Sequence, residues 1–223
     1  GFGDALIAMP LLTLAVGLQT AAPVFALVAF TSSIAILAGS WRDVQLREAW
    51  PLVAGSAIGV PFGLVLLTRA PESAMKLFLG VTIVVFGLSR PLLPGLQLRH
   101  GGIAPAGFAG AVAGVLGGAY NINGPAVAMY GTLRRWTPQR FRATMQGFFL
   151  PNGAMLVIGH GVAGLWSRQM LIYSAACIPA MLLGVAIGSR LNRRIRPERF
   201  ELWIAALLVG IGSLLAAETL LTG

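Results

Sequence analysis

Apolar runs without any charged residue alternate with short charged segments along the whole chain. Most runs are about 20 residues long, which is the length of an α-helix that crosses a bilayer. They do not alternate polar and apolar positions as the strands of a membrane barrel would, so they predict an all-α membrane protein. The expected segments are an apolar piece that ends near Val16, helices over 20–38, 49–68, 73–93, 143–167, 169–189 and 200–222, and a longer uncharged run over 101–133.

The composition supports this interpretation and excludes other classes of protein. Of the 223 residues, 57% are hydrophobic and 10% are charged, whereas a typical soluble domain has about 25% charged residues. A chain so poor in charge cannot cover a soluble globule, which excludes a soluble enzyme and a disordered chain. A single cysteine, Cys177, excludes an internal disulfide. The length allows roughly eight membrane crossings with short connections.

The net charge of +9 comes from basic residues between the apolar runs. The positive-inside rule explains this placement, so we expect no nucleic-acid partner. The orientation of the chain in the membrane depends on the run over 101–133. At about 1.5 Å per residue, this run is longer than one ordinary crossing. If this run crosses once, 11 of the 16 basic residues share one side; if it enters and leaves on one side, 13 do. The second count would make the halves of the chain inverted, as in many secondary transporters.

The chain also resembles a duplicated unit. Residues 1–95 would form a first repeat and 101–223 a second, each with about four helical segments, and together they would make one membrane domain. The first repeat has no counterpart for residues 101–115, so we expect the chain to begin partway through a helix. Equivalent positions are Trp41 and Trp166, Gly59 and Gly184, Gly63 and Gly188, Gly87 and Gly212, and, at a shorter offset, Pro10 and Pro125.

The long run contains the most informative polar segment, LGGAYNINGP at 116–125. Glycine and proline interrupt helical hydrogen bonding, and asparagine is costly in lipid. A break at membrane depth is tolerated only where protein buries it or where it lines a cavity, and the start of a half-helix there would bind a small anion. The alternative is a kinked helix whose asparagines bond to neighbouring helices. The candidate substrate-binding residues in this segment are Gly117, Gly118, Asn121, Asn123 and Gly124.

A second glycine-rich segment, GFGD at 1–4, adds Gly1, Gly3 and Asp4 as candidate substrate-binding residues. An intramembrane carboxylate is a functional candidate by default. Beside an anion it would need a proton or a partner, so Asp4 is also the candidate for proton coupling. The alternative is that Asp4 caps the following helix. Intramembrane aspartyl proteases also carry GxGD, but their chemistry needs paired carboxylates, and Asp43 lies in a charged loop.

Polar residues in the following helices extend the candidate site. Thr144 and Asn152 are candidate substrate-binding residues, Gln146 is a further polar position beside them, and residues 31–33 of the first repeat are Thr-Ser-Ser. They could line one cavity, although such residues also join membrane helices by hydrogen bonds. His160 could titrate or be incidental. We expect neither a metal nor a cofactor.

These segments resemble the sulfite exporter TauE/SafE family of membrane permeases over essentially the whole chain. The family pattern of a glycine-rich break followed by an apolar segment with proline occurs twice, as GFGDALIAMP and GGAYNINGPAVAMY. An Arg-Ala-Thr helix with a later asparagine, from Arg142 to Asn152, and the glycine-rich helix with a basic end, GVAIGSRLNRRIRPERF, also match. The resemblance implies a permease of the bacterial inner membrane, with two repeats of about four helical segments, that moves sulfite, sulfonates or related small anions.

The sequence therefore predicts a multi-pass secondary transporter of a small anion, with sulfite or organosulfonates as the leading substrates and with proton coupling. Its expected partners are this anion and the lipid bilayer, and a homo-oligomer is left open. We expect no enzymatic activity. The alternatives are a transporter of another small solute, such as a carboxylate, and a non-transporting membrane partner or sensor.

Overall fold

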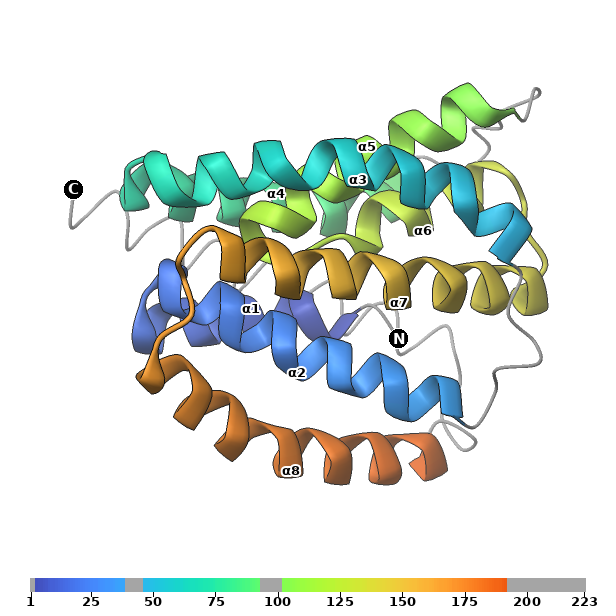
Figure 1. Ribbon diagram of the computed structural model, residues 1–223. Helices are drawn as coiled ribbons and strands as arrows, with labels where there is room; N and C mark the ends of the chain where they lie inside the picture. Colours follow the sequence, from blue (N-terminus) through green and yellow to red (C-terminus); the bar gives the residue numbers. More distant parts are fainter. Residues whose placement is uncertain (1–2, 39–45, 93–101, 192–223) are drawn as a thin grey trace.

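The computed structural model describes residues 3–38, 46–92 and 102–191, and every helix or strand assigned within them is an α-helix (Figure 1). The all-α fold class is therefore confirmed. Gly1 and the helix expected over 200–222 lie outside the described residues. The helices are α1 Gly3–Val16, α2 Leu18–Ala38, α3 Leu46–Arg69, α4 Glu72–Leu92, α5 Ile103–Tyr120, α6 Gly124–Leu133, α7 Pro138–Val162 and α8 Arg168–Leu191.

Most helix boundaries lie close to those expected from the apolar pattern. The predicted turn after Val16 is present, because Gly17 has a φ of 77°, a left-handed conformation that glycine adopts without strain. α2 begins at the next residue, two positions before the expected start, and ends at Ala38 as expected. The first two helices are thus placed by one glycine.

The range of 143–167 expected for the helix that corresponds to α7 is wrong, because α7 begins and ends five residues earlier. Its start is set by capping. The Arg140 N–H donates to the Thr137 hydroxyl oxygen at 3.3 Å, and Pro138 lies in the first turn. Threonine at the cap and proline in the first turn favour a helix start here, so the helix includes basic residues that the apolar pattern assigned to a loop.

The long uncharged run is interrupted, as the sequence predicts. α5 and α6 are separate helices of 18 and 10 residues. Asn121 ends α5 in the left-handed conformation with a φ of 55°, which asparagine tolerates better than most residues, and its N–H donates to the Gly117 carbonyl at 2.7 Å. Asn123 precedes α6, and Pro125 lies in the first turn, where its missing N–H costs nothing.

α5 packs along α3 in the same direction and at close range. Near the start of both helices Gly55 lies against Gly107, and farther along Gly63 lies against Gly118. A methyl group added to either glycine of α3 would collide with the backbone of α5. Small residues allow such close approach inside a membrane, where packing rather than the hydrophobic effect holds helices together.

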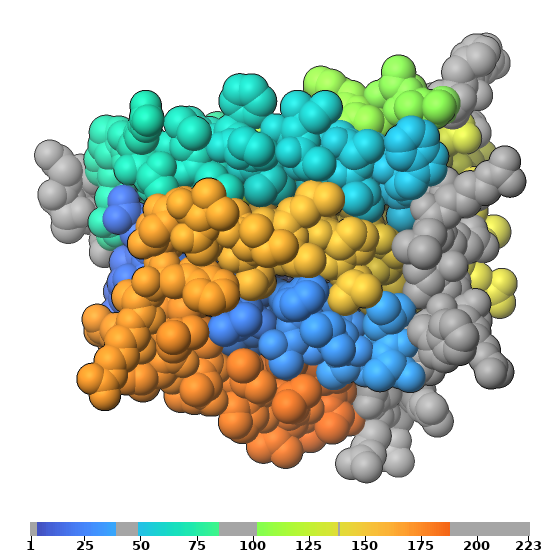
Figure 2. Space-filling model, in the orientation of Figure 1, coloured from blue at the N-terminus to red at the C-terminus, as the bar shows by residue number. Residues whose placement is uncertain are grey.

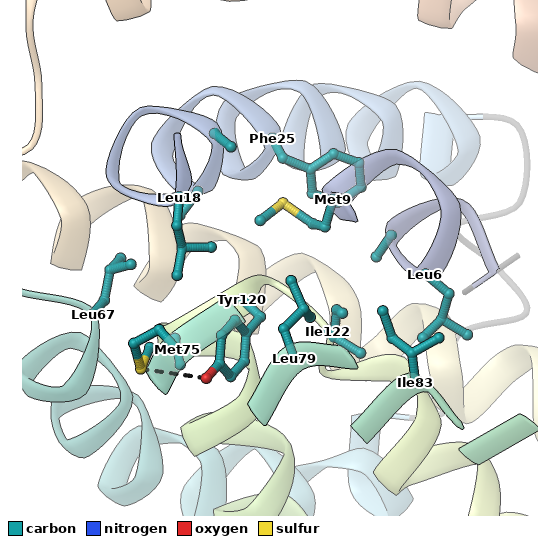
Figure 3. Packing of buried hydrophobic residues seen from close by; sticks show 14 residues of the cluster. Leu6, Met9, Leu18, Phe25, Leu67, Met75, Leu79, Ile83, Tyr120 and Ile122 are labelled. Atoms are coloured by element: carbon teal, nitrogen blue, oxygen red, sulfur yellow. Dashed lines mark hydrogen bonds between the residues drawn. The ribbon is translucent and has the colours of Figure 1, made fainter. Parts of the chain in front are cut away.

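α6 folds back toward the end of the bundle at which α5 began. Tyr130 of α6 belongs to the same buried cluster as Ala106 in the first turn of α5 and Leu52 in α3. The break between α5 and α6 is therefore the tip of a hairpin. This tip packs against α1, since Ile122 and Leu6 share a second buried cluster (Figure 3).

The helix ends gather on two sides of the bundle. The Leu18 N–H donates to Glu72 Oε1 at 3.4 Å, and Leu165, just after α7, packs against the cluster that contains Leu18. The ends of α1, α3 and α7 and the starts of α2, α4 and α8 thus share one side, which we call the Gly17 side. The starts of α3, α5 and α7 share the opposite side, which we call the Thr137 side (Figure 1).

Among the described helices, α2, α3, α5 and α8 are both long and apolar enough to cross a membrane. α4 and α7 have 21 and 25 residues. α7 lies between α3 and α2 across one face of the molecule, and α8 lies beside α2 (Figures 1 and 2). α8 is the least covered of the membrane-length helices, with 11% of its span buried against 39–44% for the other three.

Substitution of Gly59 by alanine is expected to destabilise the protein, because the new Cβ would collide with the carbonyl oxygen of Ala111 in α5. Overpacking of this kind costs about 1–3 kcal/mol, so the melting temperature in detergent should fall by several degrees. Gly184→Ala is the matched control, since no atom of the described residues lies within 4 Å of a Cβ at that exposed position of α8. Equal melting temperatures for both variants would contradict the close α3–α5 contact.

Candidate functional site

A cavity of about 60 Å³ lies between α1, α2, α7 and the break that joins α5 to α6. It has room for roughly four to six waters at about 10–15 Å³ each. Its polar lining comes from Asp4 at the start of α1, residues 32–33 of α2, Asn121 and Asn123 of the break, and Gln146 of α7. Its aromatic lining consists of Phe25, Phe30 and Phe149.

The two asparagines of the break have different roles in the structure. The Asn121 side chain donates to the Ala22 carbonyl of α2 at 2.7 Å, which ties the break to its neighbour. Asn123 is 9% exposed, lines the cavity, and makes no side-chain hydrogen bond to the residues that the structure describes. Its amide is therefore available to a bound solute, whereas one donor of Asn121 is already used.

Two short helices begin at the cavity. Asp4 and Ala5 of the first turn of α1 line it, and so does Asn123, the residue that precedes α6. The first N–H groups of a helix have no intrahelical acceptor, and the helix dipole places partial positive charge there. The cavity thus has two sources of positive potential. The carboxylate of Asp4, in the first turn of α1, opposes one of them.

Thr144 and Asn152 lie on a different face of α7 from the residues that line the cavity. The Ser56 hydroxyl of α3 donates to Asn152 Oδ1 at 2.5 Å, and both residues are fully buried. Thr144 is also fully buried, and its hydroxyl has no partner among the described residues. Because a helix turns about 100° per residue, position 144 points away from Gln146, which faces the cavity, and neither Thr144 nor Asn152 lines it.

The candidate glycines of the second repeat shape the walls around the cavity. A Cβ at Gly117 would come within 3.3 Å of Asn123 and 3.6 Å of Leu156, both of which line the cavity. Gly118 instead faces α3, and Gly124 is the buried first residue of α6. In the first repeat, Gly3 begins α1. These glycines provide space for close packing around the polar groups.

The structure adds three residues of α7 to the site that the sequence did not assign to it. Phe149, Gly153 and Leu156 line the cavity together with Gln146, which the sequence had offered as a polar position. Their spacing of three and four residues places them on one helix face. The signal that could have found them is this spacing. Counted from Gln146 along the helix, it selects these residues and leaves out Thr144 and Asn152.

An apolar groove of about 440 Å³ adjoins the cavity between α1, α2 and α8. It shares Asp4, Phe25, Ala29 and Ser32 with the cavity, and almost all its other lining atoms are apolar. Such a surface suits hydrocarbon rather than an anion. The polar groups that could hold a charged solute therefore belong to the smaller cavity.

An all-α bundle with several membrane-length helices, an interrupted helix and a polar cavity at the interruption has the architecture of a multi-pass membrane transporter. The chain belongs to the family described as Sulfite exporter TauE/SafE, whose family model matches residues 1–215. This match confirms the resemblance found in the sequence, and with it the assignment as a membrane permease. Neither a search of curated proteins nor a search of solved structures finds a significant match.

The hydrogen bond between Ser56 and Asn152 should be measurable as a stability term. In a double-mutant cycle of Ser56→Ala and Asn152→Ala, we expect a coupling energy of about 0.6 kcal/mol, the average for hydrogen bonds between membrane helices, and at most about 1.7 kcal/mol. Unfolding in mixed micelles would supply the four free energies. Because both side chains lie off the cavity, anion affinity should change little in Ser56→Ala. Strictly additive single effects would show that the two side chains are not coupled.

Proposed function

We propose that this protein is a secondary transporter of a small sulfur oxyanion, with sulfite as the favoured substrate, in the bacterial inner membrane. The family description supports the sulfur chemistry, because it names sulfite export. The observation that carries the proposal is that α1 and α6 both begin at one polar cavity. Helix starts are common anion sites, since their free N–H groups and dipoles replace part of the hydration shell.

The donors around the cavity favour an anion over a cation. Asn123, Ser32 and Gln146 offer amide or hydroxyl hydrogens beside the two helix starts. The volume of about 60 Å³ suits a compact oxyanion such as sulfite better than a longer organosulfonate. Gly117 would keep the wall narrow beside Asn123, and Gly118 would hold α5 close to α3 behind it.

Asp4 supports coupling of transport to a proton. Its carboxyl lies at the same cavity as the proposed anion. Two negative charges this close in a medium of low dielectric repel strongly. The carboxyl therefore carries a proton while the anion is bound and releases it when the cavity empties, so one proton accompanies each anion.

Alternating access would come from movement of one repeat against the other. α2 runs from the Gly17 side to the Thr137 side and lies beside α7, which runs the opposite way (Figure 1). α3 and α8 also run in opposite directions. This arrangement supports inverted repeats over 1–95 and 101–223. The α5–α6 hairpin would then enter and leave on the Thr137 side, which the positive-inside rule would place in the cytoplasm.

Purified protein in liposomes tests the substrate. Vesicles that contain the protein should accumulate labelled sulfite under a pH gradient, and unlabelled sulfite should compete better than formate or acetate. Vesicles that take up no sulfite in any gradient would contradict the proposal. Stronger competition by the carboxylates would favour the alternative of a carboxylate transporter.

Asn123→Ala should weaken sulfite binding, because it removes a free donor from the cavity wall. A hydrogen bond to a charged group is worth about 1.5–3 kcal/mol, so the Kd should rise roughly 10- to 150-fold. The control is Gln169→Ala, an amide on exposed α8 whose donor bonds to the Tyr173 hydroxyl at 2.7 Å. Unchanged affinity in Asn123→Ala, measured by calorimetry, would remove this residue from the site.

Asp4→Asn should separate binding from coupling, because an amide of the same size cannot exchange a proton. Sulfite exchange between compartments of equal pH should continue. The steady-state accumulation that a pH gradient drives should fall to the level set by exchange alone. A variant that accumulates sulfite as strongly as the parent protein would show that the coupled proton is not carried by Asp4.

A further inference from the structure

His160 extends the cavity-lining face of α7 beyond the cavity. Phe149, Gly153 and Leu156 line the cavity, and His160 follows Leu156 by one turn on the same face. Four residues of helix rise by about 6 Å. The ring therefore lies just past the cavity, toward the Gly17 side, on the straight continuation of the cavity wall.

The imidazole of His160 is fully buried and has no hydrogen-bond partner among the described residues. The residue is 0% exposed, and neither Nδ1 nor Nε2 meets hydrogen-bond geometry with any described residue. The Leu156 and Gly118 carbonyls lie near the ring without completing such a bond. A neutral imidazole carries one donor and one acceptor, and each one left unpaired in a protein interior costs free energy.

No charged side chain of the surrounding helices compensates this ring. Arg47 and Glu48 of α3 and the arginines of α7 lie at the Thr137 ends of those helices, and α2 and α5 carry no charge. On the Gly17 side, Arg69 ends α3, and Glu72 and Lys76 of α4 pair with each other at 3.5 Å. Tyr120, the titratable residue at the end of α5, donates its hydroxyl hydrogen to Met75 Sδ at 3.3 Å (Figure 3). The wall next to His160 is apolar, since Leu64 of α3 lies against the neighbouring Gly159.

An anion that leaves the cavity toward the Gly17 side would have to pass this apolar region. An unpaired charge in such surroundings is costly unless an opposite charge accompanies it. Asp4 lines the cavity itself, at the start of α1, which is the end of that helix farther from Gly17. Of the described side chains that continue the cavity wall toward the Gly17 side, His160 is the one that can gain a positive charge.

We propose that His160 is a proton-binding residue that compensates the charge of the substrate anion as it passes between the cavity and the Gly17 side. This role rests on the proposed function. When that side opens, water reaches the ring, and its unprotonated nitrogen forms an N–H bond with a proton from this water. The imidazolium then attracts the anion. The N–H bond breaks and the proton returns to the same water once the anion has left, so His160 changes the rate of transport and not its stoichiometry.

The transport test uses His160→Gln, which keeps an amide donor and acceptor but cannot gain a charge. We expect sulfite affinity within twofold of the parent protein and an unchanged steady-state accumulation, but an initial rate reduced more than tenfold. In the Asp4→Asn background, where no proton is coupled, the rate of sulfite exchange should rise on acidification of the Gly17 side, and His160→Gln should remove this dependence. A variant with the parent rate and pH profile would overturn the role of His160. Parent protein that moves no sulfite would instead contradict the proposed function.

A spectroscopic test covers the case in which the variant does not fold. The chain has two histidines, so His100→Gln protein labelled with ¹⁵N-histidine reports on His160 alone. In nanodiscs with sulfite, acidification should produce an imidazolium signal, and without sulfite the ring should stay neutral over a wider pH range. A ring that stays neutral at every pH at which the protein transports sulfite would overturn the proposal.

Discussion

The structure depends on one constraint: inside a bilayer, every backbone polar group of an interrupted helix must find its partner within the protein. The break between α5 and α6 meets it by being enclosed. The Asn121 backbone bonds back to α5, its side chain bonds to Ala22 of α2, and the glycine contact with α3 holds α5 in place. Because these bonds secure the break, Asn123 and the start of α6 are left free to face a solute.

The two faces of α7 have different roles: one joins the helix to α3 and the other lines the cavity. One face carries Asn152, which bonds to Ser56 and joins α7 to α3. The other carries Gln146 and Leu156, which line the cavity, and continues to His160. A movement of this helix would therefore change the cavity and the buried imidazole together. The same face could then bind the anion and compensate its charge during passage.

The sequence predicted the all-α fold and the interrupted helix better than it predicted which residues line the cavity there. Apolar runs placed most helices, Gly17 placed the first turn, and the LGGAYNINGP segment placed the break. The predicted start of α7 was wrong, because a Thr-Pro cap extends the helix into a basic segment. Asn121 and Asn123 could not be told apart, since only the neighbouring α2 decides which of their amides is already bonded.

The amino-acid sequence by itself determined which segments are apolar enough for the bilayer and where their helices must be interrupted. These properties are local, since they follow from side-chain polarity and from the backbone preferences of glycine, proline and asparagine. Tertiary structure decided which polar residues meet at the cavity and which join helices. That choice depends on the rotation of α7 and on its neighbours, so Gln146 faces the cavity while Asn152, six residues later, bonds to α3.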